Sequence, residues 1–280
     1  MKKQKKHKKR KKQKKDIGLI ALHKLTARHV LVLETDLGYL GYLDICQIVH
    51  LAELIRMAGN ELIRIMKKNL EQMKRTKRYR ILQSLYQKAK AAGDEDERKK
   101  IAAEMKELQE QYNVTWDFCC DSMALIKDKY HINSVFALSK AEDVWSAVEK
   151  CLYSDGKTIH FKKYGDYSEI RAKQRNRGIM IKADKNGLYF EIGDITFRPL
   201  MHKPKRTKTR SGRPIDVKED FDLFAESEIE AICNYLCNAK AADKAALEAY
   251  NKKKILVDTY RPCFASLVCK EIRGKMRVYV

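Results

Sequence analysis

The hydrophobic period of the chain changes near Gly156, and this change limits the folds that the sequence can adopt. Apolar residues before it recur at three and four positions, as in Ala141, Val144, Trp145, Val148 and Leu152. After it, Ile159 to Lys162 alternate between apolar and polar. A period near 3.6 predicts an amphipathic helix, and a period of two predicts a half-buried strand. We therefore expect a helical part followed by a β-rich part.

Several helix starts can be read in the first part. Ser139 and Glu142 form an S-x-x-E capping box, which predicts a helix that begins at Ser139. Thr115 is a candidate N-cap of the preceding helix. The acidic run that follows Gly93 predicts another helix start, because acids favour the N-terminal end of the helix dipole. Together these signals predict a helical region from about residue 42 to residue 153.

The second part carries strand and turn signals. The strand candidates are Thr158–Lys163, Gly178–Lys182, Leu188–Ile192 and Ile195–Arg198, with two more around Arg273-Gly274-Lys275. Asn186-Gly187 is a hairpin signal, because both residue types tolerate positive φ. Another strand is expected within 17–35, where Val30 to Leu33 is apolar. Short strands interrupted by helices fit a barrel of the oligonucleotide-binding kind.

The charge of the chain favours a nucleic-acid partner. Lys and Arg number 59 against 37 Asp and Glu, and the net charge is +22. Eleven of the positive charges lie in the first fifteen residues, so the remainder still carries +11. Such a body favours phosphate binding through counterion release, although excess lysine that only aids solubility is an alternative. The tail has no apolar residues to bury and is expected to be disordered.

Basic residues gather around the change of period, and some have aromatic neighbours. Phosphates would be contacted by the basic side chains, and bases would stack on the aromatic rings. The alternative for the lysines and arginines from Lys162 to Arg177 is an ordinary solvated loop, and that for His160 is a partly buried position on a strand. The expected nucleic-acid-binding residues are His160, Phe161, Lys162, Lys163, Tyr164, Arg171, Lys173, Arg175, Arg177, Arg273, Lys275 and Arg277.

Three stretches of the chain resemble a known family. The run DVWSAVEKCLYSDGKTIHFKKYGDYSEIRAKQRNRGI, Asp143 to Ile179, is similar to the central part of the N-terminal half of TnpB-like proteins. Tyr112–Phe136 resembles the helical segment that precedes this run, and Arg273–Val280 resembles the hairpin that leads to the nuclease domain. The similarity covers Leu37–Val280 in patches. These proteins are transposon-encoded RNA-guided nucleases related to the type V CRISPR effectors.

The resemblance implies an α+β fold in which a helical recognition lobe is inserted into a β-rich wedge barrel of the oligonucleotide-binding type. The expected segments are a disordered basic tail at 1–16, a first wedge strand at 17–36, the recognition lobe at 37–155 and the wedge domain with an inserted helix at 156–280. In the family these parts hold guide RNA and the RNA–DNA heteroduplex. RNA and DNA are therefore the expected partners. The alternative is a stand-alone RNA-binding or regulatory protein derived from such a transposase.

The same resemblance bears on catalysis. In the family, a RuvC-like nuclease with three separated carboxylates binds two metal ions, and a four-cysteine zinc ribbon accompanies it; both follow the terminal hairpin. Two-metal chemistry needs such carboxylates on a rigid scaffold. We therefore expect a fragment, a truncated reading frame or an isolated lobe that has no catalytic residues and is inactive alone. No cofactor is expected in this chain, since a divalent metal would belong to the missing nuclease domain.

The cysteines and the apolar runs predict the cellular compartment of the protein and whether it contacts a membrane. The eight cysteines form no C-x-x-C pair; Cys233 and Cys237 could share a metal, but small buried side chains are the favoured role. Scattered cysteines indicate a reducing compartment, so we expect a cytoplasmic protein associated with the bacterial nucleoid. No apolar run approaches the ~20 residues of a membrane helix, and no membrane partner is expected.

Overall fold

The computed structural model describes most of the chain. The described residues are 18, 22, 33–35, 40–154, 156–166, 169–173, 177–199, 220–257, 259–263, 265–272 and 275–280, without the side chains of 220–226, 270–272, 275–277 and 279. The expected disordered tail at 1–16 lies outside these residues, as do Arg175 and Arg273.

The chain divides into two compact units. The first comprises Met1–Leu31 and Arg206–Arg261, and the second comprises Val32–Lys205 and Pro262–Val280. Helices and strands meet in the second unit, so the expected boundary near residue 156 falls inside it. Each unit is described by itself below.

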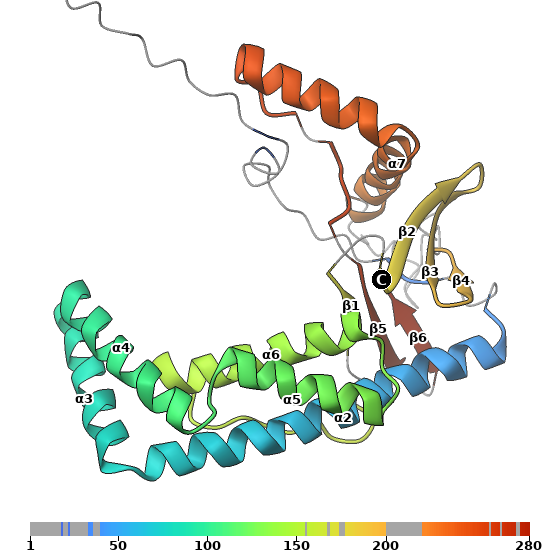
Figure 1. Ribbon diagram of the computed structural model, residues 1–280. Coiled ribbons are helices and arrows are strands. Elements are labelled where there is room, and N and C mark those ends of the chain that lie inside the picture. Colours follow the sequence, from blue (N-terminus) through green and yellow to red (C-terminus); the bar gives the residue numbers. More distant parts are fainter. Residues whose placement is uncertain are drawn as a thin grey trace, which may run out of the picture. The chain divides into compact units, whose positions relative to one another are not determined.

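Five helices form the first half of the second unit. Their bounds are α2 Tyr42–Arg75, α3 Lys77–Ala92, α4 Glu95–Gln111, α5 Trp116–Lys129 and α6 Ser134–Tyr153. Helices α2, α5 and α6 pack against one another, and α3 packs on α4 (Figure 1). The helices bury apolar faces spaced by three and four residues; Ile55, Leu62 and Met66 of α2 are among the fully buried side chains.

Two helix starts lie where the sequence predicts them, and a third does not. The Thr115 side chain accepts a hydrogen bond from the amide of Phe118, so its predicted role as N-cap of α5 is confirmed. Asp94 caps α4 in the same way at the acidic run after Gly93. The predicted start at Ser139 is wrong, because α6 begins at Ser134 with Asn133 as its N-cap. Ser139 lies within α6 and not at its start, because the apolar face of the helix begins earlier, at Phe136. Ser139 is buried there.

Two small antiparallel sheets complete the second unit. The first has the order β1-β5-β6, with β1 Ile170–Ala172, β5 Ala265–Ile272 and β6 Lys275–Tyr279. The second has the order β2-β3-β4, with β2 Ile179–Asp184, β3 Gly187–Ile192 and β4 Ile195–Phe197. The predicted hairpin forms, but its turn residues are Lys185 and Asn186, since Asp184 pairs with Gly187. Of the two residues expected at positive φ, only Gly187 has it, at 101°. Mixed helices and antiparallel sheets confirm the α+β class.

A short N-terminal piece joins these sheets. Leu33 exchanges backbone hydrogen bonds with Val280 at 2.8 and 2.9 Å, and the amide of Thr35 donates to the carbonyl of Val278 at 2.8 Å. Thr35 also forms an isolated antiparallel bridge with Pro199, just beyond β4. Residues 33–35 therefore link β6, at the edge of the first sheet, to Pro199, which follows β4 of the second sheet.

Helix α7, Asp220–Lys253, belongs to the first unit. It is interrupted at Asn238, which has φ −129° and ψ 30°, and the Tyr235 hydroxyl donates across this interruption to Asp243 at 3.1 Å. Within the described parts of both units, no helix is long and apolar enough to cross a membrane.

Candidate nucleic-acid interface

The extended segment 157–164 lies against helix α2, and this docked segment holds five of the predicted site residues. The predicted strand at Thr158–Lys163 is wrong, because these residues have no strand partner within the described chain. The reason lies in α2. Asn60 accepts a hydrogen bond from the Lys162 amide at 3.0 Å and donates to the Lys162 carbonyl at 2.8 Å. The side-chain amide of Asn60 thus takes the place of a neighbouring strand.

Arg56 of α2 adds a second anchor for the docked segment. Its Nη1 donates to the Lys162 carbonyl at 2.9 Å, and its other nitrogens form two hydrogen bonds with the Glu53 carboxylate. The hydrogen bond with Glu53 is the main cause that raises the pKa of Arg56 above its ordinary value. The guanidinium is thus fixed in place by one backbone and one side-chain acceptor.

Two aromatic rings of the docked segment are exposed, and each lies near a cation of α2. Phe161 is 46% exposed and Tyr164 is 84% exposed. The Lys67 Nζ lies 5.6 Å from the centre of the Phe161 ring, and the Arg56 Cζ lies 6.0 Å from that of Tyr164. These distances allow cation–π attraction, and they leave ring area open to solvent. We call Phe161, Lys162, Lys163, Tyr164, Arg56 and Lys67 the aromatic–basic strip.

Three lysines of the strip have no acidic partner within the described chain. Lys67, Lys162 and Lys163 make no ion pair there, whereas Arg56 is paired with Glu53. His160 is exposed beside them on the docked segment. An anion that approached the strip would therefore meet lysines whose charge is not already neutralised by a carboxylate.

The predicted basic loop that begins at Arg171 is arranged differently. Arg171, within β1, donates to the Ser139 carbonyl and to the Asp143 carboxylate of α6. Lys173 forms an ion pair with Glu142 of the same helix. The loop has no acid in its own sequence, but the fold brings these two from α6. Arg171 and Lys173 thus hold β1 and the following residue against the helix bundle.

The remaining predicted residues are less defined. Arg177 is exposed next to β2. Lys275 and Arg277 lie on β6, where Arg277 pairs with Lys270 and Lys275 pairs with Ile272 in the backbone ladder. The strip and β6 therefore come from different elements of the second unit.

One basic residue that the sequence interpretation passed over is Lys140 of α6. It is only 7% exposed, and its stem crosses Gly59 of α2, where an added Cβ would lie 2.4 Å from the Lys140 Cε. Burial, and after it the charge of Lys162, lowers the pKa of Lys140 to about 8. The sequence does contain a signal: Phe136, Lys140 and Val144 are four residues apart, so a lysine stands in the apolar register.

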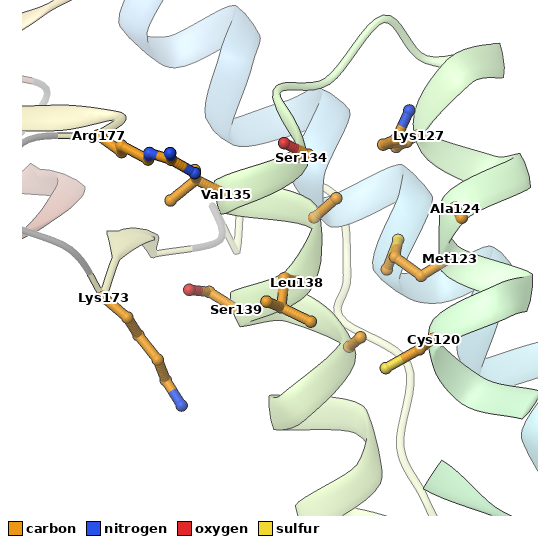
Figure 2. Close-up of a pocket in the computed structure, with 12 residues that line it drawn as sticks. Cys120, Met123, Ala124, Lys127, Ser134, Val135, Leu138, Ser139, Lys173 and Arg177 are labelled. Carbon is orange, nitrogen blue, oxygen red and sulfur yellow. The ribbon is translucent and has the colours of Figure 1, made fainter. Parts of the chain in front are cut away.

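A groove lies between α5 and α6. It has a volume of about 330 Å³, and apolar side chains such as Met123, Val135 and Leu138 line it, with Lys127, Lys173 and Arg177 at its edge (Figure 2). Lys127 is paired with Asp128 and Lys173 with Glu142. The groove therefore offers mainly apolar surface.

Two buried cysteines of the second unit have thiols that are harder to ionise than usual. Burial raises the pKa of Cys119 to about 12 and that of Cys269 to about 11, which keeps both thiols protonated near neutral pH. Cys233 is half-buried and Cys237 is exposed on α7. No group of three His, Cys, Asp or Glu side chains that could hold a metal ion occurs in the described ranges.

No family model, curated protein or solved structure matches the chain in the comparisons with known proteins.

Proposed function

We propose that the chain binds nucleic acid through the aromatic–basic strip. The carrying observation is that two exposed rings and three lysines without acidic partners among the described residues lie together on α2 and the segment fixed to it. Single strands bind proteins by stacking bases on aromatic rings while cations follow the phosphates. The net charge of +22 would draw the polyanion to the surface.

The strip fits a single strand or an unpaired loop better than a uniform duplex, because its rings can stack only on bases that are not already paired within a helix. Asn60 fixes the backbone of Lys162 between the two rings, so the strip is prepared before the ligand arrives. Such preparation lowers the entropy that binding must overcome. The test is a titration of labelled single-stranded RNA against Phe161→Ala and Tyr164→Ala.

Each of these variants should weaken binding by about 1–3 kcal/mol if one base stacks on each ring. Tyr42→Ala is the matched control, because Tyr42 is 81% exposed at the start of α2 and belongs to no part of the strip. If the strip variants and the control bind alike, the strip is not the binding surface.

We further propose the finer assignment that the sequence resemblance implies: the recognition lobe and wedge barrel of a TnpB-like RNA-guided nuclease, with guide RNA as ligand. The bridge between Thr35 and Pro199, together with the pairing of Leu33 with Val280, supports a barrel that includes an N-terminal strand. Helices α2 to α6 leave after this strand and return before β1, as an inserted lobe would. In this assignment DNA is bound as the paired strand of the heteroduplex.

This assignment is tested by sequencing the RNA that co-purifies with the chain from its native host. One structured RNA encoded next to the gene should be enriched over total RNA. Recovery of fragments in proportion to their cellular abundance would contradict the assignment, while leaving general RNA binding in place.

A further inference from the structure

Lys140 is buried with its charge almost uncompensated. Its ammonium lies 3.9 Å from Asp143 Oδ2 and makes no hydrogen bond to the part of the chain that the structure describes. Gly59 leaves the space through which the stem passes, since a Cβ there would collide with it. The Lys140 Nζ keeps some contact with solvent, but burial of the side chain removes much of the water around its three donors, which is unfavourable without acceptors. A lysine whose stem is buried and whose ammonium makes no hydrogen bond within the described residues is suited to a ligand that supplies acceptors.

Arg171 reaches the same carboxylate from β1. Its Nη2 donates to Asp143 Oδ1, so one carboxylate is shared by Arg171 and Lys140. The Arg171 Nε is buried, and no acceptor within the described residues reaches it. One buried donor without an acceptor in the described chain, the Arg171 Nε, and one ammonium without a hydrogen bond there, that of Lys140, therefore lie around Asp143.

Among the charged groups that act most strongly at Lys140, the cations outnumber the carboxylates by one when Lys140 itself is included. Besides Asp143, the groups that act on the Lys140 ammonium are Lys162, Arg171 and Glu169. Three cations therefore face two carboxylates. A phosphodiester carries a single negative charge and several acceptor oxygens, which matches both the excess charge and the unused donors.

We propose that Lys140, Arg171 and Lys162 form a seat for one phosphate group, where α6, β1 and the docked segment meet. The inference rests on the proposed function and names the chemistry of the contact. Lys162 belongs to both the seat and the aromatic–basic strip, so a phosphate held here would place the adjoining bases near Phe161 and Tyr164. Phosphate contacts of this kind fix the register of a strand.

The seat predicts a pH dependence. Burial and the charge of Lys162 lower the pKa of Lys140 to about 8, against the opposing effect of Asp143 and Glu169. A bound phosphate adds negative charge and raises the pKa again. Binding therefore takes up a proton, and affinity falls as the pH rises above about 8.

The experiment compares the wild type, Lys140→Met and Lys150→Met with a short labelled single-stranded RNA over a range of salt concentrations. Lys150 is the control, since it is an exposed lysine in the last turn of the same helix. Methionine keeps most of the Lys140 stem and removes the charge. Lys140→Met should lower the slope of log K against log salt by about 0.7, the value for one lost contact with a single strand. Lys150→Met should leave the slope unchanged.

Thermal unfolding without RNA separates binding from folding. Lys140→Met should be at least as stable as the wild type, because Asp143 keeps Arg171 as its partner. If Lys140→Met does not fold, the pH dependence of RNA binding by the wild type provides the test. An RNA affinity that stays constant from about pH 7 to about pH 9 would then overturn the seat.

The two proposals can fail separately. If the wild type binds RNA but Lys140→Met shows the same slope and affinity, the seat is wrong and the strip stands. If the wild type shows no salt-dependent RNA binding, the proposed function fails. Inorganic pyrophosphate then tests the seat: it should raise the melting temperature of the wild type and not that of Lys140→Met. An equal effect on both proteins, or none, would overturn it.

Discussion

Gly59→Ala should destabilise the wild-type chain and stabilise the Lys140→Ala variant, because the two residues occupy complementary positions on facing helices. In α2 an added Cβ at residue 59 would lie 2.4 Å from the Lys140 Cε and 3.3 Å from its Cδ and Cγ. Carbon atoms in contact are ordinarily about 3.5–4.0 Å apart. The buried lysine stem must therefore move by more than 1 Å, as judged from these two separations.

Two opposing effects set the magnitude. Alanine is favoured over glycine inside a helix by about 1 kcal/mol, and this gain applies in both backgrounds. Overpacking a filled site costs about 1–3 kcal/mol, and this cost applies only while Lys140 is present. We therefore expect a coupling free energy of about 1–3 kcal/mol in the double-mutant cycle.

The assay uses the two tryptophans of the chain, Trp116 and Trp145, whose ring centres lie 6.4 Å apart between α5 and α6. Urea unfolding of the four proteins, followed by tryptophan fluorescence, reports on the helix bundle without interference from α7. Independent sites add within about 0.3–0.5 kcal/mol. A Gly59→Ala effect that agrees within that range in both backgrounds would refute the proposed crossing of the lysine over the glycine.

Two further outcomes are expected from urea unfolding. Lys140 has a folded-state pKa of about 8, below its unfolded value of 10.5, so the unfolded chain binds more protons between these values and the wild type gains stability as the pH rises. The advantage of Lys140→Met over the wild type should thus shrink by about 3 kcal/mol across this window, and a difference that does not vary with pH would contradict it. Thr115→Ala should lower the unfolding free energy by about 1 kcal/mol through loss of the α5 cap. Thr158→Ala is the control, because Thr158 is exposed in the docked segment, and it should leave the unfolding free energy almost unchanged. An equal loss of unfolding free energy in the two variants would show that the cap contributes nothing.

Local patterns predicted the elements whose stability is decided locally. Thr115 caps α5 as expected. Spacing by three and four residues also predicts a buried stripe of Ile101, Met105, Leu108 and Tyr112; the first three are buried on α4, whereas Tyr112 is half-buried at its C-cap. The Asn186-Gly187 hairpin joins β2 and β3. In each case the residues that determine the geometry are neighbours along the chain, so the sequence displays them together.

The errors arose where a distant partner decides the outcome. Alternation in Thr158–Lys163 indicated a strand, but the partner is the side chain of Asn60, about a hundred residues earlier. The S-x-x-E pattern at Ser139 is real, yet Asn133 offers an earlier cap and the apolar face continues back to Phe136. Neither Asn60 nor Arg56 carries a sequence signal, since both are ordinary helix residues until a segment docks on them.

The candidate site was predictable as a composition and not as a geometry. Basic residues around Lys162 were expected to contact phosphate, and charge alone could not separate those that the fold uses from those that it leaves available. Arg171 and Lys173 are paired with acids of α6, whereas Lys162 and Lys163 have no such partner in the described chain. The difference depends on which carboxylates the fold brings near.

Lys140 lies between these two classes, and it shows why burial has to be considered along with pairing. An exposed lysine without a partner is solvated at little cost, so its lack of a carboxylate says little about function. A buried lysine has lost most of that solvation, and the single contact with Asp143 at 3.9 Å does not replace it. The glycine at position 59 adds to this cost, because alanine would favour the helix. The chain therefore loses stability at this place through both the glycine and the buried lysine. A ligand that supplies acceptors for the ammonium would explain why both residues are present.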